Sequence, residues 1–398
     1  MDIQAWRATP FFTDAQRAMA QAFEDWVCGA LLPALAGRGI ALDDPASHTA
    51  QAMEQDCRLI ARLLGQGGWL DSLADSAVFS VRSLVLQREV LARYAPLADF
   101  VFAMQALGAA SVLHGGSAAQ QAQYLPQIVS GEVLCAFALS ESAAGSDAAA
   151  LTCQARPQPD GFVVQGEKCW ISHGQHADVC ILFARSAETP KPQHGISAFV
   201  VERHLSPWRV CEEFTMLAPH PLARIAWDGV GLPAAALLGA PQRGYALALQ
   251  VLQALRSSVA AAALGMARAA LQRAIGHAKQ RSMYGGVLAD QAVCAATLAQ
   301  QAASLDGAGL LCARAAWLYD CQPQDAALAQ AVAQAKWQAT EHAQQIIDRA
   351  QQVFGAAAMC DGHPLARLYR EVRALRIYEG ASEVQQHIVA RSVLQQGV

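Results

Sequence analysis

The sequence predicts an α+β protein with an N-terminal all-α domain, a central β-barrel or β-sandwich domain and a C-terminal α-helical bundle. Three observations along the 398 residues support this order. Residues 1–131 are rich in Ala and Leu with helical spacing, and residues 132–240 hold short apolar runs between Gly, Pro and Asp. Residues 241–398 show long helical patterns without strand signals. We take these three ranges as the domains.

Helices are predicted where apolar residues recur every three or four positions and Gly or Pro stands at the joints. In the N-terminal domain the predicted helices are residues 15–35, 47–64, 78–94 and 97–114. In the C-terminal domain they are residues 245–281, 288–319 and 324–354, with a turn around Pro323. Helices of this length packed side by side form a bundle.

Strands are predicted at short apolar runs bounded by turn residues. These runs are residues 134–139, 162–164, 179–184 and 196–201. Pro159-Asp160-Gly161 predicts a tight turn before the second run, because Asp and Gly tolerate the backbone angles that such a turn requires.

Composition limits the possible functions. Hydrophobic residues make up 54% of the chain and charged residues 16%, well below the usual share of about 25%. This indicates a large buried surface, with a subunit interface as the expected place for the excess. The net charge of -4 and the pI near 6.3 give no electrostatic reason to expect nucleic acid or an anionic membrane as a partner.

Location and redox state are predicted from the apolar stretches and the cysteines. The longest apolar stretches, such as residues 259–270, contain Arg268 and many alanines, so we expect no membrane span. The first six residues lack the basic and apolar regions of a secretory signal, and we expect a cytoplasmic protein. Eleven cysteines without a CxxC pair favour reduced core residues over disulfides or a zinc site.

Glu379 is the candidate catalytic base. It stands between Ile377-Tyr378 and Gly380, just before a segment with helical spacing. Ser382 followed by Gln385 fits a capping box, which predicts a short turn that enters the final helix. A carboxylate partly desolvated there would have a raised pKa and could act as a general base. The alternative is a solvated loop glutamate, since Glu is rarely fully buried.

Two stretches of the β domain are candidates for a cofactor site. At residues 138–147 a strand ends in a small, polar loop with Gly145, whose amides and hydroxyls could hold a phosphate or a flavin edge. A plain strand-to-loop transition is the alternative. Trp170 ends another strand and is either a cofactor wall or a core residue. His173 and His176 have no carboxylate or Cys at ligand spacing, so we expect loop residues and no metal site.

Nucleotide motifs narrow the way in which a cofactor could bind. The sequence has no GxGxxG and no GxxxxGK[ST] pattern, which excludes a Rossmann crossover and a P-loop. Arg281 closes a helical pattern shortly before Gly285-Gly286. It could favour the helix C-terminal dipole or bind a pyrophosphate with two hydrogen bonds.

Taken together, these motifs resemble the acyl-CoA dehydrogenase family. The similarity is collinear at residues 136–147, 166–174, 281–285, 351–373 and 377–391. Each motif is weak alone, and their joint order is specific. The resemblance implies FAD-dependent α,β-dehydrogenation of an acyl-CoA to the trans-2-enoyl-CoA in fatty acid metabolism, an electron-transfer flavoprotein as acceptor and a homo-oligomer of two or four subunits.

The resemblance also implies roles for site residues. Glu379 would remove the substrate's α-proton while the β-hydrogen leaves as hydride to flavin N5. The Glu379 backbone amide and an FAD ribityl hydroxyl would polarise the thioester carbonyl. The substrate side is implied to comprise Ser146, Arg256, Tyr378 and Gly380.

The resemblance also implies a set of residues that contact FAD. They contact the flavin ring, the pyrophosphate and the FAD of a neighbouring subunit. These residues are Phe137, Leu139, Ser140, Gly145, Ser146, Trp170, Ile171, Ser172, Arg281, Met283, Gln352, Gly355, Ala356, Ala381 and Glu383. The chain departs from the family pattern at several positions. Ala356 replaces a glycine, and its methyl is expected to alter cofactor affinity or local geometry. Gln253 stands where an acidic residue is frequent, Ala381 replaces a threonine, and Ser142 stands where proline is common.

Three other activities compete with this interpretation. The first is the same reaction on an acyl chain tethered to a carrier protein. The second is a nitroalkane-type flavin oxidase, which is expected to carry Asp where Glu379 stands. The third is a nucleic-acid-binding flavoprotein, which is expected to have a basic C-terminal face. Some relatives carry the base on a helix near position 256, but Leu255-Arg256-Ser257 offers no carboxylate, which favours Glu379.

Overall fold

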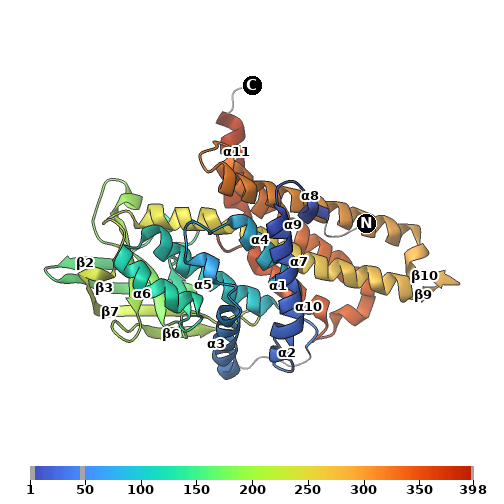
Figure 1. Ribbon diagram of the computed structural model, residues 1–398, viewed down its shortest axis with the longest axis horizontal. Helices are drawn as coiled ribbons and strands as arrows, with labels where there is room; N and C mark the ends of the chain where they lie inside the picture. The colour runs from blue at the N-terminus through green and yellow to red at the C-terminus, as the bar shows by residue number, and fades with distance from the viewer. Residues whose placement is uncertain (1–4, 45–49, 396–398) are drawn as a thin grey trace. The chain divides into compact units, whose positions relative to one another are not determined.

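The computed structural model describes residues 5–44 and 50–395, coloured along the chain in Figure 1. These residues form two compact units, each considered by itself. The helical unit takes its residues from Met1–Ser47, Ser80–Asp99 and Gln253–Val398, and the sheet unit from His48–Phe79 and Phe100–Leu252. The N-terminal helices are divided between the units, so the three predicted domain ranges stay a prediction.

The N-terminal third is helical, as predicted. Its α-helices are α1 (Asp14–Trp26), α2 (Leu32–Leu35), α3 (Ala50–Gln66), α4 (Val81–Tyr94), α5 (Pro96–Gly115) and α6 (Ala118–Val129). A capping box fixes the start of α1, where Thr13 Oγ1 accepts from the Gln16 N–H and Gln16 Oε1 accepts from the Thr13 N–H. The helix predicted for residues 47–64 corresponds to α3, and the start of that range lies outside the described residues.

The sheet unit is built on one sheet of eight strands. These are β1 (Cys135–Ala138), β2 (Gln154–Gln158), β3 (Gly161–Ser172), β4 (Val179–Arg185), β5 (Ile196–Glu202), β6 (Arg209–Phe214), β7 (Leu222–Pro233) and β8 (Leu237–Leu238). The order is β6-β7-β3-β2-β4-β5-β8, and β1 pairs in parallel with β4. Gln158 pairs with Gly161 across Pro159-Asp160, so the predicted turn is confirmed.

Apolar side chains and one helix hold this sheet in place. Leu182, Phe199 and Trp227 are buried in its core. Helix α6 lies along the sheet in Figure 1, and Gln120 Nε2 donates to the Leu237 carbonyl at 3.0 Å. The predicted β domain between two helical regions is therefore confirmed.

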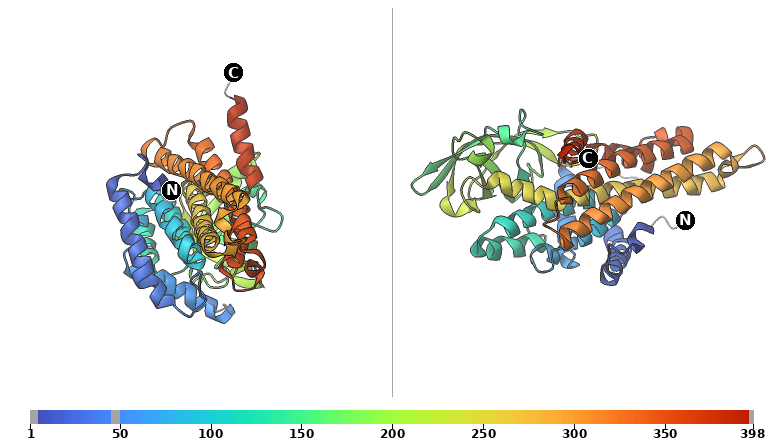
Figure 2. Two further views of the ribbon diagram at one scale, coloured as in Figure 1. Left: turned by 90° about the vertical axis from the view of Figure 1, so that its right-hand side faces the viewer. Right: turned by 90° about the horizontal axis from the view of Figure 1, so that it is seen from above.

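The helical unit contains the long C-terminal helices. They are α7 (Gly244–Gln280), which begins in the sheet unit, α8 (Ala292–Cys321), α9 (Leu328–Phe354), α10 (Pro364–Leu375) and α11 (Ser382–Gln395). Figure 2 shows α8 and α9 running side by side. Their facing surfaces bury small residues such as Ala308, Ala316, Ala335 and Ala339, which lets the helices approach closely. Gly355 ends α9 with a φ of 66°, a conformation that suits glycine.

Two local predictions for the C-terminal region are wrong. Strands β9 (Ser282–Met283) and β10 (Gly286–Val287) form a small hairpin where no strand was expected. Strands of two residues are too short to show alternation. The capping box at Ser382 is also absent, because the Ser382 hydroxyl donates to Glu341 Oε1 at 2.6 Å and the Gln385 N–H donates to the Ala381 carbonyl.

The expectation about membrane spans needs correction, and the expectation of reduced core cysteines holds for most of them. By length and composition, α5 and α7 could cross a membrane, which corrects the expectation that no stretch is long enough. Most of the apolar window of each helix is buried in the structure, as in a core helix of a soluble protein, so these two helices are weak grounds for a membrane span. The eleven cysteines are free, and most are buried core residues; Cys28, Cys321 and Cys360 are exposed.

Candidate active site

The turn between α10 and α11 carries Glu379. The Tyr378 N–H donates to the Ala374 carbonyl at 3.1 Å, which starts the turn. Glu379 has a φ of 53° and Gly380 a φ of 92°, so two successive residues have a left-handed backbone. For a glutamate this conformation costs on the order of 1–3 kcal/mol, and surrounding contacts must hold it. The predicted position of Glu379 on a short turn before the final helix is confirmed.

Three side chains from three helices bind the carbonyl groups of this turn. Arg256 Nε of α7 donates to the Glu379 carbonyl at 3.0 Å. Lys336 Nζ of α9 donates to the Gly380 carbonyl at 2.7 Å, and Gln385 Nε2 of α11 donates to the same carbonyl at 3.0 Å. A Cβ at position 380 would clash with Gln385 Nε2. The turn is therefore fixed by its neighbours, and the φ of 92° at position 380 favours glycine.

The Glu379 carboxyl group is partly withdrawn from solvent. Its Oε2 atom is buried, and among the residues that the structure describes no group donates a hydrogen bond to it. Burial raises the pKa of Glu379, while the nearby cations Arg88, Arg256 and Lys336 oppose this rise. A carboxylate with a raised pKa is suited to accept a proton near neutral pH. The alternative of a fully solvated loop glutamate is therefore wrong.

A buried ion pair lies on α4 and α5 in the same unit. Arg88 Nε and Nη2 donate to the two oxygens of Asp99 at 2.8 and 2.7 Å, and Arg88 Nη1 donates to Ser258 Oγ at 3.0 Å. Both charged residues are almost fully buried, and the charge of Arg88 lowers the pKa of Glu379 while that of Asp99 raises it. Sequence reasoning missed Arg88, Asp99 and Lys336. The available signal was a charged residue inside an apolar helical stretch.

In the sheet unit, Glu141 and Lys168 join the two predicted cofactor stretches. Lys168 Nζ donates to Glu141 Oε1 at 2.8 Å and to the Leu139 carbonyl at 3.0 Å. Glu141 also accepts hydrogen bonds from the Thr152 N–H, the Thr152 hydroxyl and the Cys153 N–H. Burial opposes ionisation of Glu141, but Lys168 and these donors outweigh it and lower the pKa of the carboxyl. The pair fixes the loop after β1 against β3.

Trp170 is presented outward by an irregularity in β3. The pairing of β3 with β7 shifts register between Lys168 and Ile171, and Trp170 has a φ of 62°. Its indole is 53% exposed and stacks on Phe214 with ring centroids 4.2 Å apart. The alternative of a core tryptophan is therefore wrong. An exposed aromatic face at this position can pack against a planar ring.

The other predicted residues of the sheet unit lie around these two features. Leu139, Ser140 and Ser172 are half-buried, and the Cys169 N–H donates to the Ser140 carbonyl at 3.0 Å. Phe137 is half-buried, whereas Ile171 is buried in the core, so any contribution of Ile171 comes through its backbone. Gly145 and Ser146 are exposed just after a tight turn in which the Glu141 N–H donates to the Ala144 carbonyl.

The remaining predicted cofactor residues belong to the helical unit. Gln352, Gly355 and Ala356 border a hollow of about 560 Å³ at the end of α9. A Cβ at Gly355 would meet no atom within 4 Å. Arg281 is exposed directly after α7, and Met283 is half-buried in β9. The last two predicted cofactor residues are Ala381, which is half-buried, and Glu383, which is exposed; the predicted substrate residue Tyr378 is 38% exposed.

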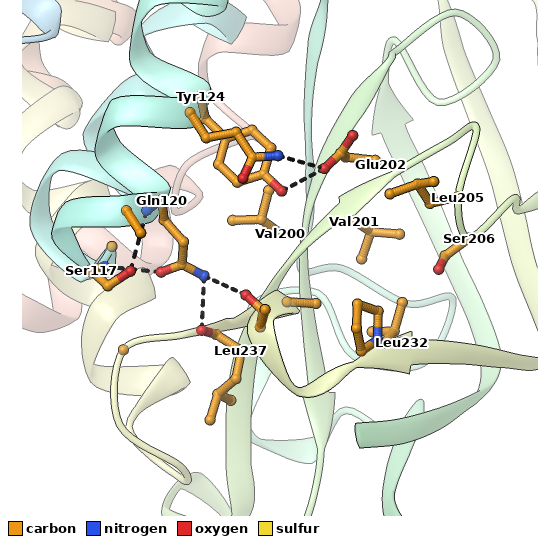
Figure 3. Close-up of a pocket in the computed structure, with 18 residues that line it drawn as sticks. Ser117, Gln120, Tyr124, Val200, Val201, Glu202, Leu205, Ser206, Leu232 and Leu237 are labelled. Atoms are coloured by element: carbon orange, nitrogen blue, oxygen red, sulfur yellow. Dashed lines mark hydrogen bonds between the residues drawn. The ribbon is translucent and has the colours of Figure 1, made fainter. Parts of the chain in front are cut away.

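A second hollow, of about 620 Å³, lies between α6 and strands β5 and β7 (Figure 3). Its polar side chains already have partners within the protein. Tyr124 Oη donates to Glu202 Oε1 at 2.7 Å, and Gln120 Nε2 donates to the carbonyls of Ala235 and Leu237. None of the predicted site residues lines this hollow, and we do not assign it to the active site.

His173, the first histidine after β3, has a structural role. His173 lies in a turn, as predicted, but is fully buried, and its Nδ1 lies 3.1 Å from the Cys135 carbonyl. Burial lowers the pKa of His173 to about 3, so the ring is neutral and Nδ1 donates. In the described ranges no cluster of His, Cys, Asp or Glu could hold a metal ion.

Two family models match most of the sheet and the C-terminal helices. They are the acyl-CoA dehydrogenase middle domain at residues 136–221 and the acyl-CoA dehydrogenase C-terminal domain at residues 242–394. The chain belongs to the acyl-CoA dehydrogenase family. It is therefore an oxidoreductase that acts on CH–CH bonds of acyl-CoA, with FAD as its cofactor.

Three individual proteins are similar to this chain over most of its length. Cyclohexane-1-carbonyl-CoA dehydrogenase of Geobacter metallireducens is 30% identical over 310 residues, covering 77% of this chain and 80% of that protein. A 3-(aryl)acrylate reductase of Clostridium sporogenes is 34% identical over 282 residues, covering 70% and 74%. The structure of butyryl-CoA dehydrogenase from Megasphaera elsdenii is 27% identical with a TM-score of 0.84, covering 96% of this chain and 99% of that one.

The residues of this acyl-CoA dehydrogenase fit an FAD cofactor in each unit taken separately. In the sheet unit, the exposed indole of Trp170 offers a face for a flavin ring. In the helical unit, Gly355 leaves its side-chain position open beside a hollow, which allows close approach of a ligand to the backbone. Ala356 is exposed, so its methyl displaces no described protein contact.

Proposed function

We propose that this enzyme converts a saturated acyl-CoA to its trans-2-enoyl-CoA with Glu379 as the catalytic base. The observation that carries the proposal is the buried Glu379 Oε2 atom, which receives no hydrogen bond from any described residue. A carboxylate oxygen with no internal partner can accept a proton without first breaking a bond. The fixed left-handed turn holds the group in one place, which is what proton abstraction requires.

The same turn supplies a donor for the thioester carbonyl. Among the described residues, no backbone carbonyl accepts a hydrogen bond from the Glu379 backbone N–H. A donor aimed at the thioester oxygen stabilises the negative charge that develops when the α-proton leaves. Arg256 Nε donates to the Glu379 carbonyl, which belongs to the next peptide group, and this contact helps to hold the turn.

FAD, when bound, supplies the redox chemistry by taking the β-hydrogen together with its electron pair. In the proposal, Trp170, Leu139 and Ser140 hold the flavin ring. Arg281 and the Gln352 to Gly355 turn hold the FAD of a neighbouring subunit, so the enzyme is a homo-oligomer. We further propose a cytoplasmic location, a role in fatty acid metabolism and an electron-transfer flavoprotein as acceptor.

The relatives suggest which acyl groups to test first. The name of one relative specifies a cyclohexane-1-carbonyl thioester, and the name of another specifies an aryl acrylate. We therefore propose a cyclic or aryl-bearing acyl-CoA as the preferred substrate. The proposed aryl substrate is a 3-arylpropionyl-CoA, which would be oxidised to the corresponding acrylyl thioester.

An anaerobic titration of the purified flavoprotein tests this function. Cyclohexane-1-carbonyl-CoA, 3-phenylpropionyl-CoA, butyryl-CoA and a long-chain acyl-CoA are each added, and bleaching of the flavin is followed. We expect the cyclic or aryl thioester to bleach fastest. Bleaching only by matched carrier-protein thioesters would contradict a CoA substrate, and oxygen consumption with a nitroalkane would support an oxidase instead.

A further inference from the structure

Lys336 is a fully buried lysine in the first half of α9. Its side chain has 0% exposure, and its Nζ lies 2.7 Å from the Gly380 carbonyl. Within the described ranges no carboxylate oxygen lies within 4.0 Å of its Nζ atom. Burying an ammonium without a carboxylate partner costs stability, so a position like this needs an explanation.

The contact of Lys336 is directed at the turn that carries Glu379. Lys336 and Arg256 bind two successive carbonyls of that turn, those of Gly380 and Glu379. A hydrogen bond from a charged donor is roughly twice as strong as one between neutral groups. The two cations therefore offset the cost of the left-handed conformation of Glu379.

Several charges face this lysine from the elements packed around it. Burial lowers the pKa of Lys336 to about 8, and Arg256 of α7 acts in the same direction. Glu379 of the turn, Glu341 of α9 and Glu383 of α11 favour the charged form instead. At neutral pH Lys336 is thus mostly protonated, and its charge favours the ionised form of Glu379.

We propose that Lys336 is a positioning residue for the base: its ammonium holds the Gly380 carbonyl so that the Glu379 carboxyl is fixed, and its charge stabilises the carboxylate. This inference rests on the proposed role of Glu379. The hydrogen bond that Lys336 donates to the turn goes to its backbone, and Lys336 is not a proton acceptor in the reaction. Its removal therefore changes both the orientation and the proton affinity of the base.

The test compares Lys336→Met with Lys336→Arg in the FAD-loaded enzyme. Methionine keeps the length of the side chain and removes both charge and donor, whereas arginine keeps both. The rate of flavin bleaching by one acyl-CoA is measured from pH 5 to 9, together with FAD content. For Lys336→Met we expect the acid limb of the profile to move up by roughly one pH unit. The maximal rate should fall roughly 10- to 100-fold from misplacement of the base.

Controls separate this effect from general damage. Lys191→Met removes an exposed lysine of the sheet unit and should leave rate and profile unchanged. Lys336→Arg should restore the acid limb. A Lys336→Met enzyme with the wild-type rate and profile would overturn the inference. If Glu379→Gln keeps turnover, the proposed function fails instead, so the two failures are distinguishable.

A measurement on the unaltered side chain covers the case in which Lys336 variants do not fold. The sequence contains only four lysines, at positions 168, 191, 279 and 336. With lysine labelled with ¹³C at Cε, one of four NMR signals of the holoenzyme should titrate near pH 8. In Glu379→Gln this titration should move to lower pH, since a negative charge has been lost. Four signals that all titrate above pH 10, or no response to Glu379→Gln, would contradict the proposal.

Discussion

Lys168 of the sheet unit and Lys336 of the helical unit are both fully buried, but they have different partners. Lys168 donates to the carboxylate of Glu141 and to the Leu139 carbonyl. Lys336 donates to the Gly380 carbonyl, with no ion-pair partner among the described residues. The first lysine is neutralised and joins two segments. The second keeps an unneutralised charge close to the Glu379 carboxyl. The electrostatic energy of the Lys336 ammonium therefore depends on the protonation state of Glu379.

The largest expected effect is the loss of the neutralised pair. Lys168→Met leaves the Glu141 carboxylate buried without its cation, and removing one partner of a buried pair costs about 3–5 kcal/mol. We expect this loss in the free energy of urea unfolding of the enzyme, together with weaker FAD binding measured by flavin fluorescence. Lys168→Met combined with Glu141→Leu should recover part of the loss. If the double variant is as unstable as the sum of the single variants, the two residues are not coupled.

The two lysine sites should change their contributions to the free energy of unfolding at opposite ends of the pH scale. The pKa of Glu141 is lowered in the folded protein, so its contribution is present above the ordinary value of about 4.3 and is lost as pH falls through the folded value. The pKa of Lys336 is lowered to about 8, so the folded state binds fewer protons than the unfolded state between about pH 8 and 10.4.

Stability at the Lys336 site should therefore rise with pH over that range, by about 2–3 kcal/mol in total. This rise is measured as the difference in free energy of urea unfolding between wild type and Lys336→Met from pH 7 to 10.5. The advantage of wild type over Glu141→Gln should instead shrink below about pH 4. A Lys336 contribution that is constant from pH 7 to 10.5 would show that this ammonium is not destabilised by burial.

A smaller effect is expected from the neutral donor on the same carbonyl as Lys336. Gln385→Leu removes the bond from Gln385 Nε2 to the Gly380 carbonyl and leaves Lys336 in place. A net hydrogen bond of about 1 kcal/mol predicts a bleaching rate lower by roughly fivefold. The acid limb of the pH profile should not move, because no charge has changed. A shift as large as that of Lys336→Met would mean that geometry, not charge, sets the proton affinity of the base.

The smallest effect is expected for Ala356→Gly, which is distant in role from both lysine sites. Ala356 is exposed beside the hollow at the end of α9, so Ala356→Gly should change unfolding free energy by no more than about 0.5 kcal/mol. In contrast to the effect expected from the sequence alone, FAD affinity, measured by fluorescence titration, should also stay within roughly threefold, because the exposed methyl displaces no described contact. A much tighter FAD complex in the glycine variant would show that the methyl group obstructs the cofactor.

Local signals predicted much of the fold. The helical periodicity, the apolar strand runs and Pro159-Asp160-Gly161 depend on neighbouring residues, and the structure confirms them. The turn at Glu379 was predicted for the same reason. The capping box at Ser382 was wrong, because Glu341, which lies 41 positions away along the chain, takes the serine hydroxyl. A contact of that range has no signature in local spacing.

The candidate site was predicted only in part, also for reasons of distance along the chain. Lys336 and Gly380 are 44 positions apart, and Arg256 and Glu379 are 123 apart. These contacts exist because helices from different parts of the sequence pack around one turn. Trp170 was left open between core and cofactor wall, since its exposure depends on the register shift between β3 and β7.

The most direct test of the central claim is the anaerobic bleaching rate of Glu379→Gln compared with wild type. The substrate is an acyl-CoA carrying either hydrogen or deuterium at the α-carbon, and Glu132→Gln, an exposed glutamate, is the matched control. We predict that deuterium slows the wild type and the control, and that Glu379→Gln binds FAD but bleaches roughly 10²- to 10⁴-fold more slowly. Bleaching of Glu379→Gln at the wild-type rate, with the same isotope effect, would contradict the assignment of Glu379 as the base.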